Sequence, residues 1–349
     1  MSAAAVFGDA LHPALQVTGL AVDFPVERAL VRAVAGASFS VRRGETVALV
    51  GESGSGKSVS ALATMGLVDA PGRVSGDVRI DGQPVLGLRE DQWRSLRGRK
   101  VAMVFQDPMT SLNPSHRIVR QVAEAIRVHD ARVSKHDARD RAVALLERVG
   151  IVPAAARARD YPHQLSGGQR QRVMIAMAIA NQPDVLIADE PTTALDVTIQ
   201  AQIIDVIREM QERYESGVIA ITHDLGVVAE IADKVMVMYG GRTVEYGPVD
   251  EIYYNPHHPY TWGLLGSLPR LDLAEKTRLT PIKGQPPDLL MLPAGCPFVG
   301  RCLYERAECR ENWPELEIIG PDHGVNCWIP EDERTALRGT LTAFRKAAS

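Results

Sequence analysis

A glycine-rich segment of the chain matches the pattern G-x-x-x-x-G-K-[ST], which binds the phosphates of nucleotides. It runs from Gly51 to Ser58. Glycines let the backbone curl so that successive N–H groups point at phosphate oxygens, and the helix that follows adds partial positive charge. Lys57 has the reach for the β- and γ-phosphates, and the Ser58 hydroxyl is a ligand for Mg²⁺. The candidate nucleotide contacts are Gly51, Ser53, Gly54, Ser55, Gly56, Lys57 and Ser58.

A second segment with chemical potential is an apolar run, residues 185–188, that ends in two adjacent carboxylates. Asp189 lies where a buried strand would end, so it is a candidate ligand for Mg²⁺, directly or through water. Glu190 is the candidate that polarises an attacking water. Adjacent acids at a strand end are usually just solvated. Beside a phosphate-binding loop they indicate magnesium-dependent hydrolysis of a nucleotide.

The pentapeptide Leu165-Ser-Gly-Gly-Gln169 distinguishes this chain from other nucleotide hydrolases. It resembles the signature of the ABC ATPase family. Ser166 and the Gly167 and Gly168 amides, at a helix start, form a second anion cradle. The resemblance implies that this cradle, Gln169 included, covers the γ-phosphate held by the opposite subunit. Two ATP molecules would then lie between two head-to-tail subunits.

The resemblance implies further site residues, taken by position. Gln106 matches the glutamine that links Mg²⁺ and water to the transport domain, and His223 matches the histidine that contacts the γ-phosphate. Residues 194–196, Ala-Leu-Asp, match the loop that communicates across the dimer. Phe24 is the candidate for stacking on adenine, with Phe39 as an alternative. Taken alone, Gln106 and His223 would be interpreted as ordinary polar residues at strand ends.

The elements that must position these residues follow from the apolar pattern. Strand–helix alternation around short apolar runs predicts an α/β core. The fold class is therefore α/β: a P-loop NTPase of the ABC nucleotide-binding type, with a mixed sheet core, a helical subdomain and a small Cys-containing C-terminal appendage. We expect an ATPase domain over residues 15–247, its helical subdomain over about 108–160, and an extension over 248–349. Predicted strands cover residues 15–24, 33–41, 46–50, 185–188 and 217–222, a hairpin turn follows residues 78–80, and predicted helices cover 59–66, 118–128, 137–149, 168–180 and 198–214.

Two longer phrases narrow the resemblance to importers of dipeptides and oligopeptides. They are residues 105–114, Phe-Gln-Asp-Pro-Met-Thr-Ser-Leu-Asn-Pro, and residues 257–269 of the proline-rich appendage. The subfamily implies a second, different ATPase as partner in a heterodimer. It also implies two transmembrane permease subunits and a periplasmic or extracellular substrate-binding protein. Nickel importers and some sugar or opine importers share the pattern, so nickel or another small solute remains an alternative cargo.

The four cysteines of the chain all lie in the appendage, at Cys296, Cys302, Cys309 and Cys327. Thiolates this close in sequence can surround one metal centre. The spacing lacks the paired C-x₂-C of zinc ribbons, and related importer subunits carry an iron–sulfur cluster in this region. We therefore predict a [4Fe–4S] cluster, with Zn²⁺ and free structural thiols as the alternatives.

Composition limits the classes of function. The net charge of −4 disfavours nucleic acid as a partner, although ABC ATPases that act on DNA or ribosomes share the nucleotide motifs. No apolar run reaches the roughly 18 residues that a transmembrane helix needs, and the N-terminus lacks a secretory signal pattern. We expect a peripheral protein on the cytoplasmic face of the inner cell membrane. Intact Lys57 and Glu190 disfavour a merely regulatory subunit.

Overall fold

The computed structural model describes residues 13–26, 29–107, 111–191, 197–267 and 282–340. Its strands are β1 (Leu15–Val26), β2 (Ala29–Val41), β3 (Thr46–Val50), β4 (Arg73–Ile80), β5 (Gln83–Pro84), β6 (Val101–Val104), β7 (Val185–Asp189), β8 (Gly217–Ile221), β9 (Lys234–Tyr239), β10 (Arg242–Pro248), β11 (Glu317–Gly320) and β12 (His323–Val325). Its α-helices are α1 (Lys57–Thr64), α2 (Glu90–Leu96), α4 (Ile118–His129), α5 (Lys135–Arg148), α6 (Ala154–Arg157), α7 (Gly167–Ile179), α8 (Val197–Tyr214), α9 (Leu225–Ile231), α10 (Val249–Tyr254), α11 (Pro259–Gly266), α12 (Glu308–Glu311) and α13 (Glu331–Thr340).

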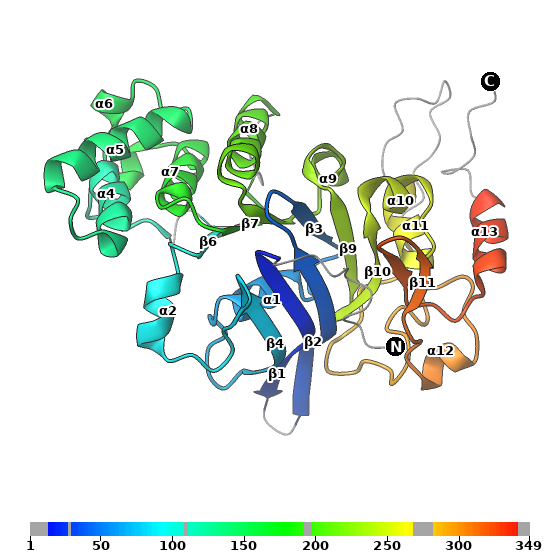
Figure 1. The fold of residues 1–349 in the computed structure, drawn as a ribbon. Helices are drawn as coiled ribbons and strands as arrows, with labels where there is room; N and C mark the ends of the chain where they lie inside the picture. Colours follow the sequence, from blue (N-terminus) through cyan, green and yellow to red (C-terminus); the bar gives the residue numbers. More distant parts are fainter. Residues whose placement is uncertain (1–12, 27–28, 108–110, 192–196, 268–281, 341–349) are drawn as a thin grey trace, which may run out of the picture.

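The central sheet has the order β11-β12-β10-β9-β3-β8-β7-β6 (Figure 1). Its middle strands β9, β3, β8, β7 and β6 run parallel, and their residues are buried throughout. Continuous apolar runs are typical of parallel strands covered on both faces, which is why the sequence pattern predicted β3, β7 and β8. The carboxyl ends of these strands share one edge, where the nucleotide motifs begin.

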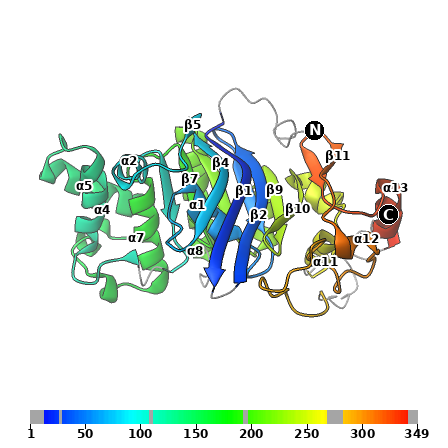
Figure 2. The same ribbon diagram turned by 90° about the horizontal axis from the view of Figure 1, so that it is seen from below.

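A second, antiparallel sheet with the order β2-β1-β4-β5 lies over the helix that follows the glycine-rich loop (Figures 1 and 2). The predicted hairpin turn is confirmed: Ile80 pairs with Gln83, and both turn residues, Asp81 and Gly82, have positive φ (52° and 74°). This is the backbone that a two-residue hairpin requires. The sheet adds apolar cover to the core through buried residues such as Phe39.

The two helices predicted from period 3.6 are confirmed as α4 and α5, and they pack against each other and against α7. Figure 1 shows this helical group at one end of the molecule. On α4 the buried side chains recur every four residues, at Ile118, Val122 and Ile126. On α5 they do so at Ala138, Ala142 and Leu146. The Ser134 hydroxyl caps α5 by accepting the Asp137 N–H at 3.1 Å.

The C-terminal region gathers at the opposite end of the molecule, where α10 to α13 lie together (Figure 1). Strand β12 pairs antiparallel with β10, with Glu245 opposite Val325, and β11 extends the same sheet. The sheet is therefore continuous across residue 247. No helix in the described part of the chain has the length and apolar character needed to cross a membrane.

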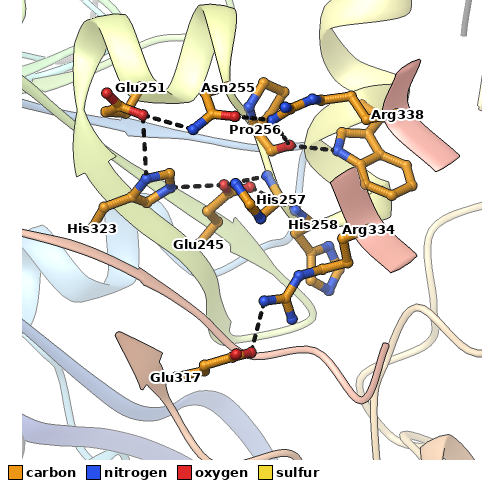
Figure 3. Close-up of polar contacts among 11 residues, drawn as sticks. Glu245, Glu251, Asn255, Pro256, His257, His258, Glu317, His323, Arg334 and Arg338 are labelled. Atoms are coloured by element: carbon orange, nitrogen blue, oxygen red, sulfur yellow. Dashed lines mark hydrogen bonds and ion pairs between the residues drawn. The ribbon is translucent and has the colours of Figure 1, made fainter. Parts of the chain in front are cut away.

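A buried polar cluster fastens this region to β10 (Figure 3). The carboxylate of Glu245, with no exposed surface, accepts the backbone N–H groups of His257 and His258 at 2.6 and 2.9 Å. His323 Nε2, on β12, lies 3.0 Å from the same carboxylate. Burial acts to raise the pKa of Glu245, but its bonds to His323 and the other donors outweigh burial and leave the pKa below its ordinary value.

Helix α13 adds arginines to the same region (Figure 3). The side chain of Arg334 is completely buried, donates to the Ile329 carbonyl at 2.7 Å and pairs with Glu317 at 2.7 Å. Arg338 donates to Asn255 and, at 3.2 Å, to the Pro256 carbonyl. A buried charge is costly unless its bonds are satisfied, so these contacts tie α13 to the rest of the appendage.

Candidate nucleotide-binding and hydrolysis site

The glycine-rich loop connects β3 to α1 in a conformation that only glycine allows at two of its positions. Gly51 has φ 148°, and a Cβ there would lie 2.1 Å from the Met238 carbonyl oxygen. Gly56, the residue before α1, has φ 99°, and its Cβ would lie 2.6 Å from the Ala33 carbonyl oxygen. The loop is thus pressed against β9 and β2, with its amides at the start of α1.

Lys57 lies inside this loop. Its Nζ donates to the Gly51 and Glu52 carbonyls, both at 2.8 Å, and to the Ser55 hydroxyl at 3.3 Å. Burial lowers the pKa of Lys57, while the charges of Glu190, Asp189 and Glu52 oppose the shift. The ammonium group therefore has three oxygen partners within the loop.

Asp189 and Ser58 form the candidate magnesium pair. The Ser58 hydroxyl donates to Asp189 Oδ1 at 3.1 Å, which joins the end of β7 to the first turn of α1. Burial raises the pKa of Asp189, and the neighbouring Glu190 adds to the shift, while Ser58 and Lys57 oppose it. A divalent cation at this point would remove the cost of the buried carboxylate, because it supplies the missing positive charge.

The three residues predicted to be catalytic meet at Glu190. Gln106 Nε2 donates to Glu190 Oε2 at 2.9 Å, and His223 Nδ1 lies 3.4 Å from Glu190 Oε1. The Glu190 backbone has φ 48°, in the left-handed region, and its N–H donates to the Ile221 carbonyl at 2.8 Å. A left-handed backbone at a non-glycine residue is uncommon, and here it directs a carboxylate at the meeting point of three strand ends.

The pentapeptide signature starts α7, as predicted. Ser166 is the N-cap: its hydroxyl accepts the Gln169 N–H at 3.3 Å, and the Gln169 side chain accepts the Ser166 N–H at 3.0 Å. This is a reciprocal capping box. Gly167, the next residue, lies on the surface: a Cβ added there would meet no atom within 4 Å. Figures 1 and 2 both place α7 beyond β7, apart from α1, so the two anion cradles of one chain do not meet.

The aromatic candidates differ in burial. Phe39 is only 1% exposed in the core below the antiparallel sheet, so its ring offers no free face to a nucleotide. Phe24 on β1 is half-buried, and its ring packs against Gly72. Phe24 as the adenine-stacking residue stays a prediction. The predicted dimer loop, residues 194–196, and residues 108–110 of the importer phrase lie outside the described residues.

The structure adds functional candidates that the motifs did not indicate. Arg301 and Tyr260, both from the appendage, contact Glu52 in the glycine-rich loop. Glu52 stood inside the motif at a position that any residue can occupy. The sequence signal for this contact was an acidic residue in a loop that binds anions. That signal did not indicate which residues contact Glu52.

All four cysteines line one small cavity of the appendage, together with apolar groups that include Phe298 and Trp328. None of them is in a disulfide. Burial raises the pKa of the Cys296 and Cys302 thiols to about 12 and also raises the pKa of Cys327. Within the described residues, no three His, Cys, Asp or Glu side chains already stand in metal-binding geometry. The four cysteines share a cavity, but the described residues contain no assembled metal site, so the cluster stays a prediction.

Comparisons with known proteins agree with this geometry. Residues 34–193 match the family described as ABC transporter, and residues 244–309 match the C-terminal region of oligopeptide/dipeptide transporters. The chain is 45% identical to the oligopeptide transport ATP-binding protein OppD of Bacillus subtilis, over 95% of this chain and 96% of that protein. It is 49% identical to the dipeptide transport ATP-binding protein DppD of Lactococcus lactis, over 90% of each.

Another relative, OppD of Mycobacterium bovis, is 53% identical over 97% of this chain, which spans only 54% of that protein's length. Among solved structures, a dimeric ATP-binding cassette in a post-hydrolysis state, bound to ADP and phosphate, aligns with a TM-score of 0.62. It is 27% identical and covers 67% of this chain and 98% of its own. The loop, the two carboxylates, the signature helix and these matches lead to one conclusion: the chain belongs to the ABC transporter ATP-binding proteins, in the oligopeptide/dipeptide transporter group.

Proposed function

We propose that this chain binds ATP with Mg²⁺ and hydrolyses it to power the import of peptides of the dipeptide and oligopeptide class. The observation that carries the proposal is the shared carboxylate of Glu190, contacted by Gln106 and His223 beside the Ser58–Asp189 pair. The similarity to peptide-transport ATP-binding proteins supports the cargo class. Nickel or another small solute is the alternative cargo.

In this proposal each residue has a separate task. Lys57 exchanges its carbonyl and hydroxyl partners for phosphate oxygens, and Ser58, Asp189 and Gln106 hold the magnesium ion. When bound, that ion neutralises charge that develops on the phosphates. Glu190 would accept a proton from the attacking water, because its carboxylate lies at the end of β7 beside the Ser58–Asp189 pair.

Gln106 and His223 keep Glu190 in position but leave it adjustable. Gln106 fixes one oxygen of the carboxylate, while the His223 side chain is 64% exposed and approaches the other at 3.4 Å. An exposed imidazole of this kind can turn from Glu190 to a γ-phosphate. The segment after Gln106 then carries the movement to the membrane subunits.

The separation of α7 from α1 supports a dimer in which the signature of one subunit closes over the ATP of the other. Ser166, Gly167, Gly168 and Gln169 would act on the partner's nucleotide through the helix N-terminus. We propose a heterodimer with a second ABC ATPase, joined to two permease subunits and supplied by a substrate-binding protein. The chain would then lie peripherally on the cytoplasmic face of the membrane.

We also propose that Cys296, Cys302, Cys309 and Cys327 hold a [4Fe–4S] cluster, with Zn²⁺ as the alternative. Four unpaired thiols around one cavity provide a donor set that suits either centre. Metal binding to thiols displaces their protons, so it would have to draw the thiolates together. Such a centre would stabilise the appendage. Anaerobic purification with iron, sulfide and zinc assays tests this, because a colourless sample that contains only zinc excludes the cluster.

The test of the main proposal is ATPase activity of the membrane-reconstituted complex, with wild type compared with Glu190→Gln. Substrate-binding protein loaded with peptides should stimulate wild type, and Glu190→Gln should remove most of the turnover. Stimulation by nickel-loaded but not peptide-loaded binding protein would reassign the cargo. Undiminished turnover in Glu190→Gln would show that this site is not the one that hydrolyses ATP.

A further inference from the structure

An ion pair links the appendage directly to the phosphate-binding loop. Arg301 Nη1 donates to Glu52 Oε2 at 2.6 Å, and Nη2 donates to Oε1 of the same carboxylate at 3.0 Å. The side chain of Arg301 is 9% exposed and that of Glu52 is 23% exposed. A bidentate, partly buried arginine–carboxylate pair of this kind is among the stronger polar contacts in proteins. It fixes the orientation of the two side chains as well as their distance.

Further contacts hold Arg301 in place. Its Nη1 also donates to the Tyr239 hydroxyl at 2.9 Å, and its Nε donates to the Lys283 carbonyl at 2.9 Å. The Tyr239 ring packs against Tyr260 and Phe298, with centroids 4.5 and 5.2 Å away. The guanidinium group is therefore held in one orientation by Tyr239 of β9 and by the Lys283 carbonyl of the appendage.

Tyr260 makes the second contact with the loop. Its hydroxyl accepts the Glu52 backbone N–H at 2.8 Å, so one loop residue is held by both its side chain and its main chain. The Glu52 carbonyl is in turn one of the three partners of Lys57. Through this single residue, the appendage fixes the first turn of the loop and one contact of its lysine.

The charge of Glu52 explains why such a contact matters. A free carboxylate in this loop would repel the phosphates of ATP and compete for Lys57. We propose that Arg301 is a positioning residue of the nucleotide site, which neutralises Glu52 and turns it away from the bound phosphates. This rests on the proposed binding of ATP. It predicts an effect on nucleotide affinity rather than on the hydrolytic step, because Arg301 contacts Glu52 in the phosphate-binding loop, whereas Gln106 and His223 contact Glu190.

The experiment is a double-mutant cycle on the purified full-length chain, with ATP affinity measured by displacement of a fluorescent ATP analogue. Arg301→Gln should weaken ATP binding about tenfold, as expected for a lost charge-assisted pair. Glu52→Gln should bind ATP within about threefold of wild type. The double variant Glu52→Gln with Arg301→Gln should recover to that same range, because the unpaired carboxylate is gone. In the reconstituted complex, Arg301→Gln should raise KM for ATP and leave kcat near the wild-type value.

A merely structural role for Arg301 would give a different pattern. In that case the double variant would bind as weakly as Arg301→Gln, and kcat would fall with the melting temperature; either result overturns the inference. Arg306→Gln is the matched control, because it removes another appendage arginine whose ion pair, with Glu333, lies away from the loop. If Arg301→Gln does not fold, Arg301→Lys replaces it and should show a smaller rise in KM with an unchanged melting temperature. Failure of wild type itself to bind ATP would refute the proposed function, and the inference with it.

Discussion

Two glutamates of the same sheet work in opposite environments. Glu190, at the end of β7, contacts Gln106 and the largely exposed His223. Glu245, on β10, has no exposed surface and is enclosed by His323 and two backbone N–H groups. The Glu190 side chain is 18% exposed, whereas that of Glu245 is fully enclosed. In the proposed mechanism Glu190 changes partners when ATP binds, while Glu245 keeps its partners at the junction with the appendage.

The largest expected effect is a loss of ATPase activity on substitution of Glu190. Glu190→Gln removes the proton acceptor but retains the hydrogen bond with Gln106, so we expect turnover to fall by about 10² to 10⁴-fold. Its melting temperature should match that of wild type, because glutamine keeps the size of the side chain and the hydrogen bond with Gln106. Steady-state ATPase rates and a thermal melt check both parts. A variant that loses stability as well as activity would break the comparison.

The reverse pattern, a loss of stability with ATP binding retained, is expected on substitution of Glu245. Glu245→Ala leaves His323 and the two N–H groups without their acceptor in a dry interior, which should cost about 3–5 kcal/mol in the free energy of unfolding. Urea unfolding of the full chain measures this. The fraction that remains folded should bind ATP with near wild-type affinity. A destabilisation under about 1 kcal/mol would mean that the cluster is not as closed as its burial indicates.

The same cluster predicts a pH dependence of stability. Burial lowers the pKa of His258 to about 4, and the pKa of His257 is also lowered to about 4 by burial. The unfolded chain therefore takes up these protons first, near pH 6.5, so the free energy of unfolding should decline as pH falls from about 6.5 to about 4. For His258 the loss is on the order of 3 kcal/mol.

His258→Asn is the variant that isolates this effect. Asparagine retains an acceptor at the N-cap of α11, where His258 Nδ1 accepts the Tyr260 N–H at 3.1 Å. Unfolding free energies measured between pH 7 and pH 4 should show about half the wild-type slope, since His257 remains. An unchanged slope would assign the pH dependence to other groups.

The smallest effect is expected at the surface of the appendage. Arg306 and Glu333 pair there with side chains 35% and 46% exposed. Arg306→Gln should lower the free energy of unfolding by less than about 1 kcal/mol, because solvent screens both charges. High salt should reduce even that difference. A larger loss would indicate that α13 depends on this pair rather than on the buried Arg334.

The sequence predicted the parts of the site that are local in the chain. The loop over Gly51 to Ser58, the acids that end β7 and the start of α7 each need only a few neighbouring residues, so their patterns survive in the sequence. The buried parallel strands β3, β7 and β8 were predicted for the same reason. Gln106 and His223 were placed by resemblance, and the structure brings both to Glu190.

The rest could not be predicted because its partners are distant. Glu52 and Arg301 are 249 positions apart, and Glu245 and His323 are 78 apart. Strand β12 has only the residues His323–Val325, which is too short for an alternating pattern. The cysteines could be grouped by spacing, but spacing does not say whether their sulfur atoms meet at ligand distance.

The separation of Glu52 and Arg301 along the sequence, 249 positions, also affects the synthesis of the chain. A ribosome that adds about 5–20 residues per second needs roughly 12–50 s to pass from one to the other. During that time the loop, the paired acids and the signature have all been made, while the arginine that neutralises the loop has not. A nascent chain would therefore carry an incomplete phosphate site until its last segment emerges, and a prematurely terminated chain would never complete it.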